Sequence, residues 1–157
     1  MHIDRAMLLP KRIIVPTDFS SMSEAALDYA LGVAKVFGGR VLLLHAFQPP
    51  AFDLPAGIIA GTADSTERIL RSAEQALASA IELRKERGVS IEPLVTRGAP
   101  WRVISELAAG RKDTMIVMAT HGRKDLPRAL LGSVAEKVVR MANCPVLVVP
   151  AKSAEGR

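Results

Sequence analysis

Apolar residues along this chain occur in two patterns, short continuous runs and longer stretches with helical spacing. The continuous runs lie at 12–16, 40–47, 90–96, 114–118 and 146–149 and are rich in valine, isoleucine and leucine. Such runs are typical of strands that helices cover on both faces. Pro93 interrupts the third run and cannot donate to a strand ladder, which places that strand at an edge of the sheet.

The helical stretches lie between these runs, at 23–37, 65–87, 100–109 and 133–143. Glycine follows each of the first three, and glycine is the usual residue just beyond a helix. Strands that alternate with helices predict an α/β fold, a doubly wound, five-stranded parallel sheet with right-handed crossovers. The 157-residue chain is therefore interpreted as a single domain, with a core at about 11–150 and short tails.

Residues 48–63 fit neither pattern, because three prolines and two glycines interrupt them. This long irregular segment follows the second strand, at the sheet edge where open α/β sheets bind ligands. It is interpreted as a candidate lid, with an insertion lacking regular structure as the alternative.

The composition is that of a globular protein, with 49% apolar and 24% charged residues. No apolar run approaches the roughly 20 residues of a membrane-spanning helix, and the first residues lack the apolar core of a secretory leader. We therefore expect a cytoplasmic protein without a membrane partner.

The net charge of +5 suggests a nucleic-acid partner at first sight. Basic and acidic residues are interleaved, however, as at 82–87, and aromatic residues make up only 4% of the chain. Interleaved charge is typical of solvated helix faces, and few aromatics leave few platforms for stacking bases, so nucleic-acid binding is not expected. The single Cys144 and three scattered histidines provide no zinc-site spacing, and Cys144 is expected to be a structural thiol.

Residues 118–134 carry the strongest functional signal. They continue an apolar run and lead into a helix, with Gly122 and Gly132 in the loop and Ser133 at the helix start. A helix N-terminus offers backbone N–H groups to an anion, and glycine lets the backbone approach it closely. Basic residues at 123, 124 and 128 agree with a polyphosphate ligand. The segment predicts a phosphate-binding turn, although the same elements also occur in connections without a ligand.

Two other strand ends carry polar side chains, with Asp18 after the first strand and His45 near the end of the second. Loops that follow neighbouring parallel strands face the same crevice, so one small ligand could contact all of them. Asp18 is a candidate for binding a ribose, or alternatively for capping the next helix beside Ser20 and Ser23. His45 is interpreted as a structural histidine, and the alternative is a catalytic base.

Together these motifs resemble the universal stress protein family from about Lys11 to Pro150. The matching segments are Arg12–Ser20 (RIIVPTDFS), Leu42–Ala46 (LLLHA), Gly98-Ala99-Pro100, Met118–Val139 and Cys144–Val149 (CPVLVV). The resemblance implies the strand order 3-2-1-4-5 in a Rossmann-like sheet of the adenine nucleotide alpha hydrolase type. It also implies a homodimer that pairs through the last strand, Val146–Val149.

The ATP-binding branch of that family carries Gly, two residues, Gly, nine residues, then Gly-Ser or Gly-Thr. Gly122, Gly132 and Ser133 fit this spacing, whereas Ala119 replaces the first glycine and adds a methyl group near the ribose. The resemblance implies ATP as the ligand, with Mg or Mn as candidate metals. The nucleotide-binding residues that it implies are Pro16, Thr17, Asp18, Ala46, Met118, Ala119, Gly122, Gly132, Ser133 and Val134.

The expected function is that of a regulatory stress-response protein that acts as a nucleotide-dependent switch. Two alternatives remain, a slow ATP hydrolase and a stress protein that binds no nucleotide and acts through contacts with an unknown protein partner. Efficient hydrolysis needs a carboxylate that anchors a metal ion. The acids nearest the loop in sequence, Asp125 and Glu136, belong to no Walker pattern, so no catalytic residue is assigned.

Overall fold

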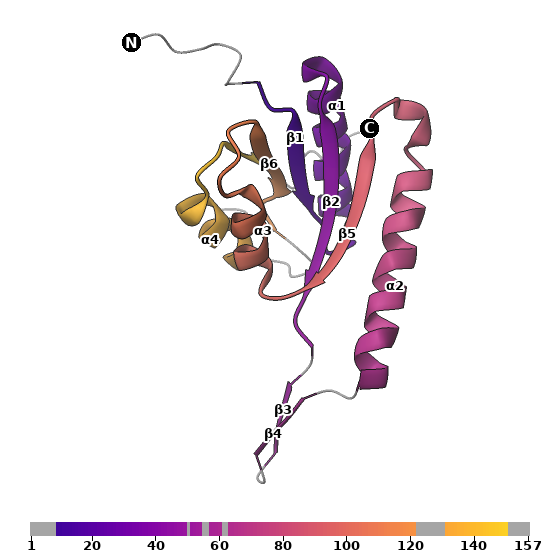
Figure 1. Ribbon diagram of the computed structural model, residues 1–157, viewed down its shortest axis with the longest axis vertical. Coiled ribbons are helices and arrows are strands. Elements are labelled where there is room, and N and C mark those ends of the chain that lie inside the picture. The colour runs from indigo at the N-terminus through magenta and orange to yellow at the C-terminus, as the bar shows by residue number, and fades with distance from the viewer. Residues whose placement is uncertain (1–8, 50, 55–56, 61–62, 122–130, 151–157) are drawn as a thin grey trace.

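The structure of the chain is a computed structural model that describes residues 9–49, 51–54, 57–60, 63–121 and 131–150. Its central feature is a five-stranded sheet with the order β5-β2-β1-β6-β7, in which every neighbouring pair is parallel (Figure 1). The strands are β1 (Arg12–Pro16), β2 (Arg40–Phe47), β5 (Ile91–Arg97), β6 (Thr114–Ala119) and β7 (Val146–Val149). Numbered among themselves these strands have the order 3-2-1-4-5, so the predicted fold is confirmed, and Pro93 lies on an edge strand as expected.

Helices cover both faces of this sheet, which explains why its strands are continuous apolar runs. On one face, α1 (Ser21–Phe37) and α2 (Ala63–Glu82) pack on a core cluster that includes Ile13 and Val15 of β1. On the other, α3 (Pro100–Ala108) and α4 (Ser133–Met141) pack on a second cluster that includes Ile14 (Figure 1). Alternate residues of β1 therefore belong to opposite cores, and all three are fully buried.

The first helix begins and ends as its sequence indicates. Ser20 is the N-cap, and its side-chain oxygen accepts a hydrogen bond from the backbone N–H of Ser23. Gly38 ends the helix with a φ of 63°, a left-handed conformation in which its N–H bonds to the carbonyl of Ala34. The chain then returns directly to β2.

The second helix is shorter than predicted, since α2 ends at Glu82 and a 3₁₀ turn, η2 (Lys85–Arg87), follows it. Arg84 lies between the two and is 8% exposed. Its guanidinium binds Asp28 of α1 at 2.8 Å and also the carbonyl of Ala80 at 3.1 Å. The regular helix ends where the apolar spacing also ends, since residues 84–87 are all charged, and Arg84 binds back to α1.

Residues 48–63 are not irregular throughout, so that prediction is wrong. They contain β3 (Ala51–Leu54) and β4 (Gly57–Ala60), which pair antiparallel with Phe52 opposite Ile59. The prolines and glycines indicate strand breaks, whereas Leu54 of β3 pairs with Gly57 of β4 in a hairpin of two short strands. The hairpin extends from the end of β2 away from the main sheet (Figure 1). Its role as a lid stays a prediction.

Candidate functional site

A cavity of about 280 Å³ opens at the carboxyl ends of the central strands, near the first turns of α3 and α4. Its volume is close to that of a small-molecule site. Its lining residues are Pro16, Thr17, Asp18, Ser23, Leu44, His45, Ala46, Pro100, Ile104, Met118, Ala119, Thr120, His121, Gly132, Ser133, Val134 and Ala135. These include every sequence-predicted binding residue except Gly122, which lies outside the described residues.

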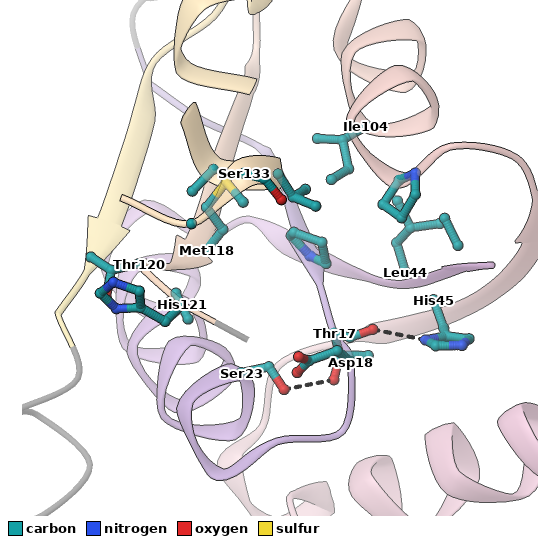
Figure 2. A pocket seen from close by; sticks show the side chains of 17 residues that line it. Thr17, Asp18, Ser23, Leu44, His45, Ile104, Met118, Thr120, His121 and Ser133 are labelled. Atoms are coloured by element: carbon teal, nitrogen blue, oxygen red, sulfur yellow. Dashed lines mark hydrogen bonds between the residues drawn. The ribbon is translucent and has the colours of Figure 1, made fainter. Parts of the chain in front are cut away.

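Figure 2 shows which side chains lie at the two ends of the cavity. Leu44 and Ile104, which also belong to the second core cluster, lie at one end, and His45 lies beside Leu44. Thr120 and His121 lie at the other end, and Met118 and Ser133 lie between them and Leu44. A cavity with both apolar and polar lining residues suits a ligand with an apolar part and a polar part.

The turn between β1 and α1 is held by its own side chains. Thr17 Oγ1 accepts a hydrogen bond from the backbone N–H of Phe19 and lies 3.0 Å from Ser23 Oγ. Asp18 Oδ1 accepts hydrogen bonds from the N–H of Ser20 at 3.0 Å and from its hydroxyl at 2.5 Å. Asp18 thus supports the residue that caps α1, as the capping interpretation anticipated in part, and it lines the cavity as well.

His45 is part of the same turn, because its Nδ1 lies 2.8 Å from the carbonyl oxygen of Thr17. Its ring contacts Phe19, with the ring centroids 4.6 Å apart. Phe19 has a φ of 64°, an uncommon value for a bulky side chain that places its ring against the histidine. These contacts agree with the interpretation of His45 as a structural residue.

The N-terminus of α4 forms the opposite wall. Gly132 is its N-cap and has no side chain to satisfy the first-turn N–H groups, and Ser133, Val134 and Ala135 of that turn line the cavity. The positive end of the helix dipole therefore lies at the cavity wall.

Gly132 also closes the preceding loop, since its N–H bonds to the carbonyl oxygen of Thr120 at 2.7 Å. A Cβ atom built on Gly132 would lie 2.8 Å from that oxygen, closer than real structures allow. Glycine is therefore required at this position by the protein's own backbone, whatever binds in the cavity.

His121 is a site residue that sequence reasoning missed. It is 8% exposed, lines the cavity, and its Nε2 has no hydrogen-bond partner among the described residues. The sequence offered one indication, which is that His121 directly precedes Gly122. The prediction relied on the small residues of that motif and therefore did not include His121.

A second cavity, of about 480 Å³, lies between the β1–α1 turn and α2. Asp18 and His45 line both cavities, and Phe19 joins them here. Four residues of α2 complete this lining, namely Arg68, Ile69, Ser72 and Ala73. The β1–α1 turn is therefore shared between two hollows.

The remaining predictions concern two acidic residues, Asp125 and Glu136, and the thiol of Cys144. Glu136 forms an ion pair with Arg140 at 3.0 Å, whereas Asp125 lies outside the described residues. No group of three metal-binding side chains occurs within the described ranges. Cys144 packs against the second core cluster, where burial raises the pKa of its thiol, as expected for a structural cysteine. None of the helices in the described part of the chain is long and apolar enough to cross a membrane.

Comparison with known proteins gives a consistent result. The family model described as "Universal stress protein family" matches residues 10–150. Universal stress protein MJ0531 of Methanocaldococcus jannaschii is 38% identical over 143 residues, which cover 90% of this chain and 82% of the relative. MJ0577 of the same organism is 30% identical over 91% of this chain and 96% of the relative.

Solved structures agree in fold. The structure of MJ0577 matches with a TM-score of 0.72 over 90% of this chain and 96% of its own. A universal stress protein solved in complex with cAMP matches with a TM-score of 0.63 at 25% identity, over 90% of this chain and 98% of its own.

Proposed function

Since the chain belongs to the universal stress protein family, we propose that it binds an adenine nucleotide, ATP in the first instance, and acts as a nucleotide-dependent regulatory stress-response protein. The observation that carries this proposal is the cavity, around which nine of the ten predicted nucleotide-binding residues lie. They come from three strand ends and one helix N-terminus that are far apart in the sequence. A relative of similar fold was solved with cAMP, which supports an adenine nucleotide as the ligand class.

The two ends of the cavity suggest the orientation of the nucleotide. The adenine base fits the apolar end, where Ala46 offers its backbone and Leu44 and Ile104 exclude water. The ribose then lies beside Thr17 and Asp18, whose carboxylate accepts hydrogen bonds from sugar hydroxyls. The phosphates reach the first turn of α4, where N–H groups and the helix dipole favour negative charge.

Ala119 bears on this proposal because it replaces the first glycine of the ATP-binding motif. It is the last residue of β6 and packs against the core cluster under α1. The extra methyl group therefore has partners in the protein core, which supports the proposal of a nucleotide site that includes alanine at this position.

We further propose that the protein is a cytoplasmic homodimer that pairs through β7. Within the described residues, β7 pairs with β6 on one side and has no strand on the other. Val146, Leu147 and Val148 are only half-buried although they are apolar. An open apolar edge strand is an association site, and a second copy satisfies its backbone groups through a two-fold interface.

The direct test of the proposed function is nucleotide binding by the purified protein. Mass analysis of material released on denaturation identifies any nucleotide that is carried through purification. Titration calorimetry of nucleotide-free protein with ATP, ADP, AMP and cAMP then ranks affinities, with GTP as a control for the base. Saturable binding of adenine nucleotides supports the proposal, and the absence of binding at millimolar ligand contradicts it.

A further inference from the structure

The second cavity takes no part in the proposed nucleotide site except through the wall that the two cavities share. Its volume of about 480 Å³ is within the range of small-molecule sites. The lining residues come from the β1–α1 turn, from β2 and from consecutive turns of α2. Segments that are distant in the sequence therefore enclose a space to which the proposed function assigns no ligand.

Apolar groups form one part of this lining. Phe19, Ile69 and Ala73 are apolar, and the ring of His45 lies against that of Phe19, with the centroids 4.6 Å apart. The backbone of Phe19 has a φ of 64°, which is costly for a bulky residue, and such conformations cluster at functional sites. These groups suit an aliphatic or aromatic part of a ligand.

Two side chains of opposite charge complete the character of the lining, Asp18 on the turn and Arg68 on α2. Arg68 binds Asp64 at 2.6 Å, but a guanidinium has five N–H donors and can bind a second carboxylate. The bonds that Asp18 accepts from Ser20 do not neutralise its charge, since both donors are uncharged. The cavity is therefore complementary to a molecule that carries a positive and a negative group together with an apolar part.

We propose that the second cavity is a binding site for an apolar α-amino acid, with the ammonium group at Asp18 and the carboxylate at Arg68. The side chain of the amino acid then packs against Phe19 and Ile69. A molecule with one charge alone leaves a charged wall of the cavity without its partner. Phenylalanine is a suitable probe, because aromatic rings pack well against one another. Binding at this site does not depend on the proposed function.

Asp18 connects the two cavities, because it lines both of them (Figure 2). An ammonium group at Asp18 offsets the charge that is proposed to hold the ribose, so the amino acid should weaken nucleotide binding several-fold. By linkage, the nucleotide must weaken binding of the amino acid by the same factor. This coupling rests on the proposed function.

Calorimetry with three related ligands tests the need for both charges. L-phenylalanine carries both, phenethylamine lacks the carboxylate, and hydrocinnamate lacks the amine, while all three have the same ring and carbon chain. We expect saturable binding of L-phenylalanine to nucleotide-free protein and at least several-fold weaker binding of the two analogues. Equal affinity for either analogue contradicts the proposal, and so does the absence of saturation at tens of millimolar L-phenylalanine.

A pair of arginine variants tests the contact with the carboxylate. Arg68→Gln should weaken binding of L-phenylalanine several-fold and leave that of phenethylamine unchanged. Arg71→Gln is the matched control, since Arg71 pairs with Glu67 four residues before it, as Arg68 pairs with Asp64, but does not line the cavity. Equal affinities of the two variants for L-phenylalanine would show that Arg68 is not the partner of the carboxylate.

A pair of serine variants tests the location of the site. Ser72 lines the cavity and is exposed, so Ser72→Phe should fill the cavity and abolish binding of L-phenylalanine without disturbing the core. Ser79→Phe is the control, because Ser79 is exposed on the same helix, seven residues further along, and does not line the cavity. Binding of L-phenylalanine by Ser72→Phe with unchanged affinity would place the ligand elsewhere.

Titration of ATP with and without saturating L-phenylalanine tests the coupling. We expect a several-fold lower affinity for ATP when the amino acid is bound, and no effect of the amino acid on Ser72→Phe. An unchanged affinity for ATP would show that the ammonium group does not lie at Asp18. If the protein binds L-phenylalanine but no nucleotide, the proposed function fails and the site stands. If it binds nucleotide but not L-phenylalanine, this inference alone is overturned.

Discussion

At the scale of single residues, Asp18 has two tasks that substitutions can separate. It supports the N-cap residue Ser20 and is proposed to hold the ribose. We expect Asp18→Ala to remove a charge-assisted hydrogen bond of about 1.5–3 kcal/mol to the sugar, which is roughly a ten- to hundredfold loss of nucleotide affinity by calorimetry.

Ser20→Ala is the control, because Ser20 caps α1 but does not line the cavity. It should cost about 1 kcal/mol of stability, or roughly 2–4 °C in melting temperature, with nucleotide affinity retained. If Asp18→Ala lowers only the melting temperature and binds nucleotide normally, its task is structural and the ribose contact is wrong.

The family resemblance implied most of the binding residues that line the cavity, and they meet there because a parallel sheet brings the ends of its neighbouring strands to one edge. His121 escaped prediction for a physical reason. Its burial and its place in the cavity lining depend on tertiary packing that no local pattern encodes. Asp18 was open between two interpretations for the same kind of reason, since capping and cavity lining both need a polar residue at that position.

At the scale of secondary-structure elements, we expect the substitution of glycine by alanine to have opposite effects on stability at two positions. Gly132→Ala places a Cβ 2.8 Å from the Thr120 carbonyl, so the contact that closes the loop onto α4 must shift. We expect a loss of about 1–3 kcal/mol in unfolding free energy together with weaker nucleotide binding. Thermal unfolding and calorimetry on one sample measure both effects.

Gly32, within α1, has no atom within 4 Å of a Cβ built on it and is exposed. Gly32→Ala should therefore raise stability by about 0.5–1 kcal/mol, since alanine restricts the unfolded chain and favours the helix. Equal melting temperatures of the Gly132→Ala variant and the unmodified protein would show that the loop closure is not needed for stability.

Elements were predictable where burial on both faces left continuous apolar runs, as in β1, β2 and β6. Prediction failed where a long-range or turn interaction decided the outcome. The helix predicted over 65–87 ends at Glu82, since residues 84–87 are all charged and Arg84 binds Asp28 of α1. The segment that contains β3 and β4 combines strand-forming residues with prolines and glycines. A prediction that weighs only the prolines and glycines therefore misses the two strands.

At the scale of the whole molecule, the proposed homodimer depends on the free edge of β7. Val148 is half-buried and, unlike Leu147, is not among the residues packed against either core cluster. Val148→Lys should therefore disrupt pairing of two copies with little damage to the core, because a charged edge residue opposes strand pairing. Light scattering should show a dimer for the unmodified protein and a monomer for the variant.

Val36→Lys is the matched control, since Val36 is 79% exposed on α1, far in the sequence from β7. It should leave the oligomeric state unchanged. A monomeric unmodified protein at micromolar concentration, or a dimer that persists in Val148→Lys, would contradict pairing through this strand.

The bond between the Gly132 N–H and the Thr120 carbonyl has a consequence for how such a domain diversifies. The hydrogen bond holds Gly132 next to Thr120, so the eleven residues between them begin and end at one fixed position. Changing the length of a segment with anchored ends costs little closure entropy and leaves the sheet untouched. A segment grafted between Thr120 and Gly132 can therefore alter what the cavity recognises while the scaffold that supports it is inherited intact.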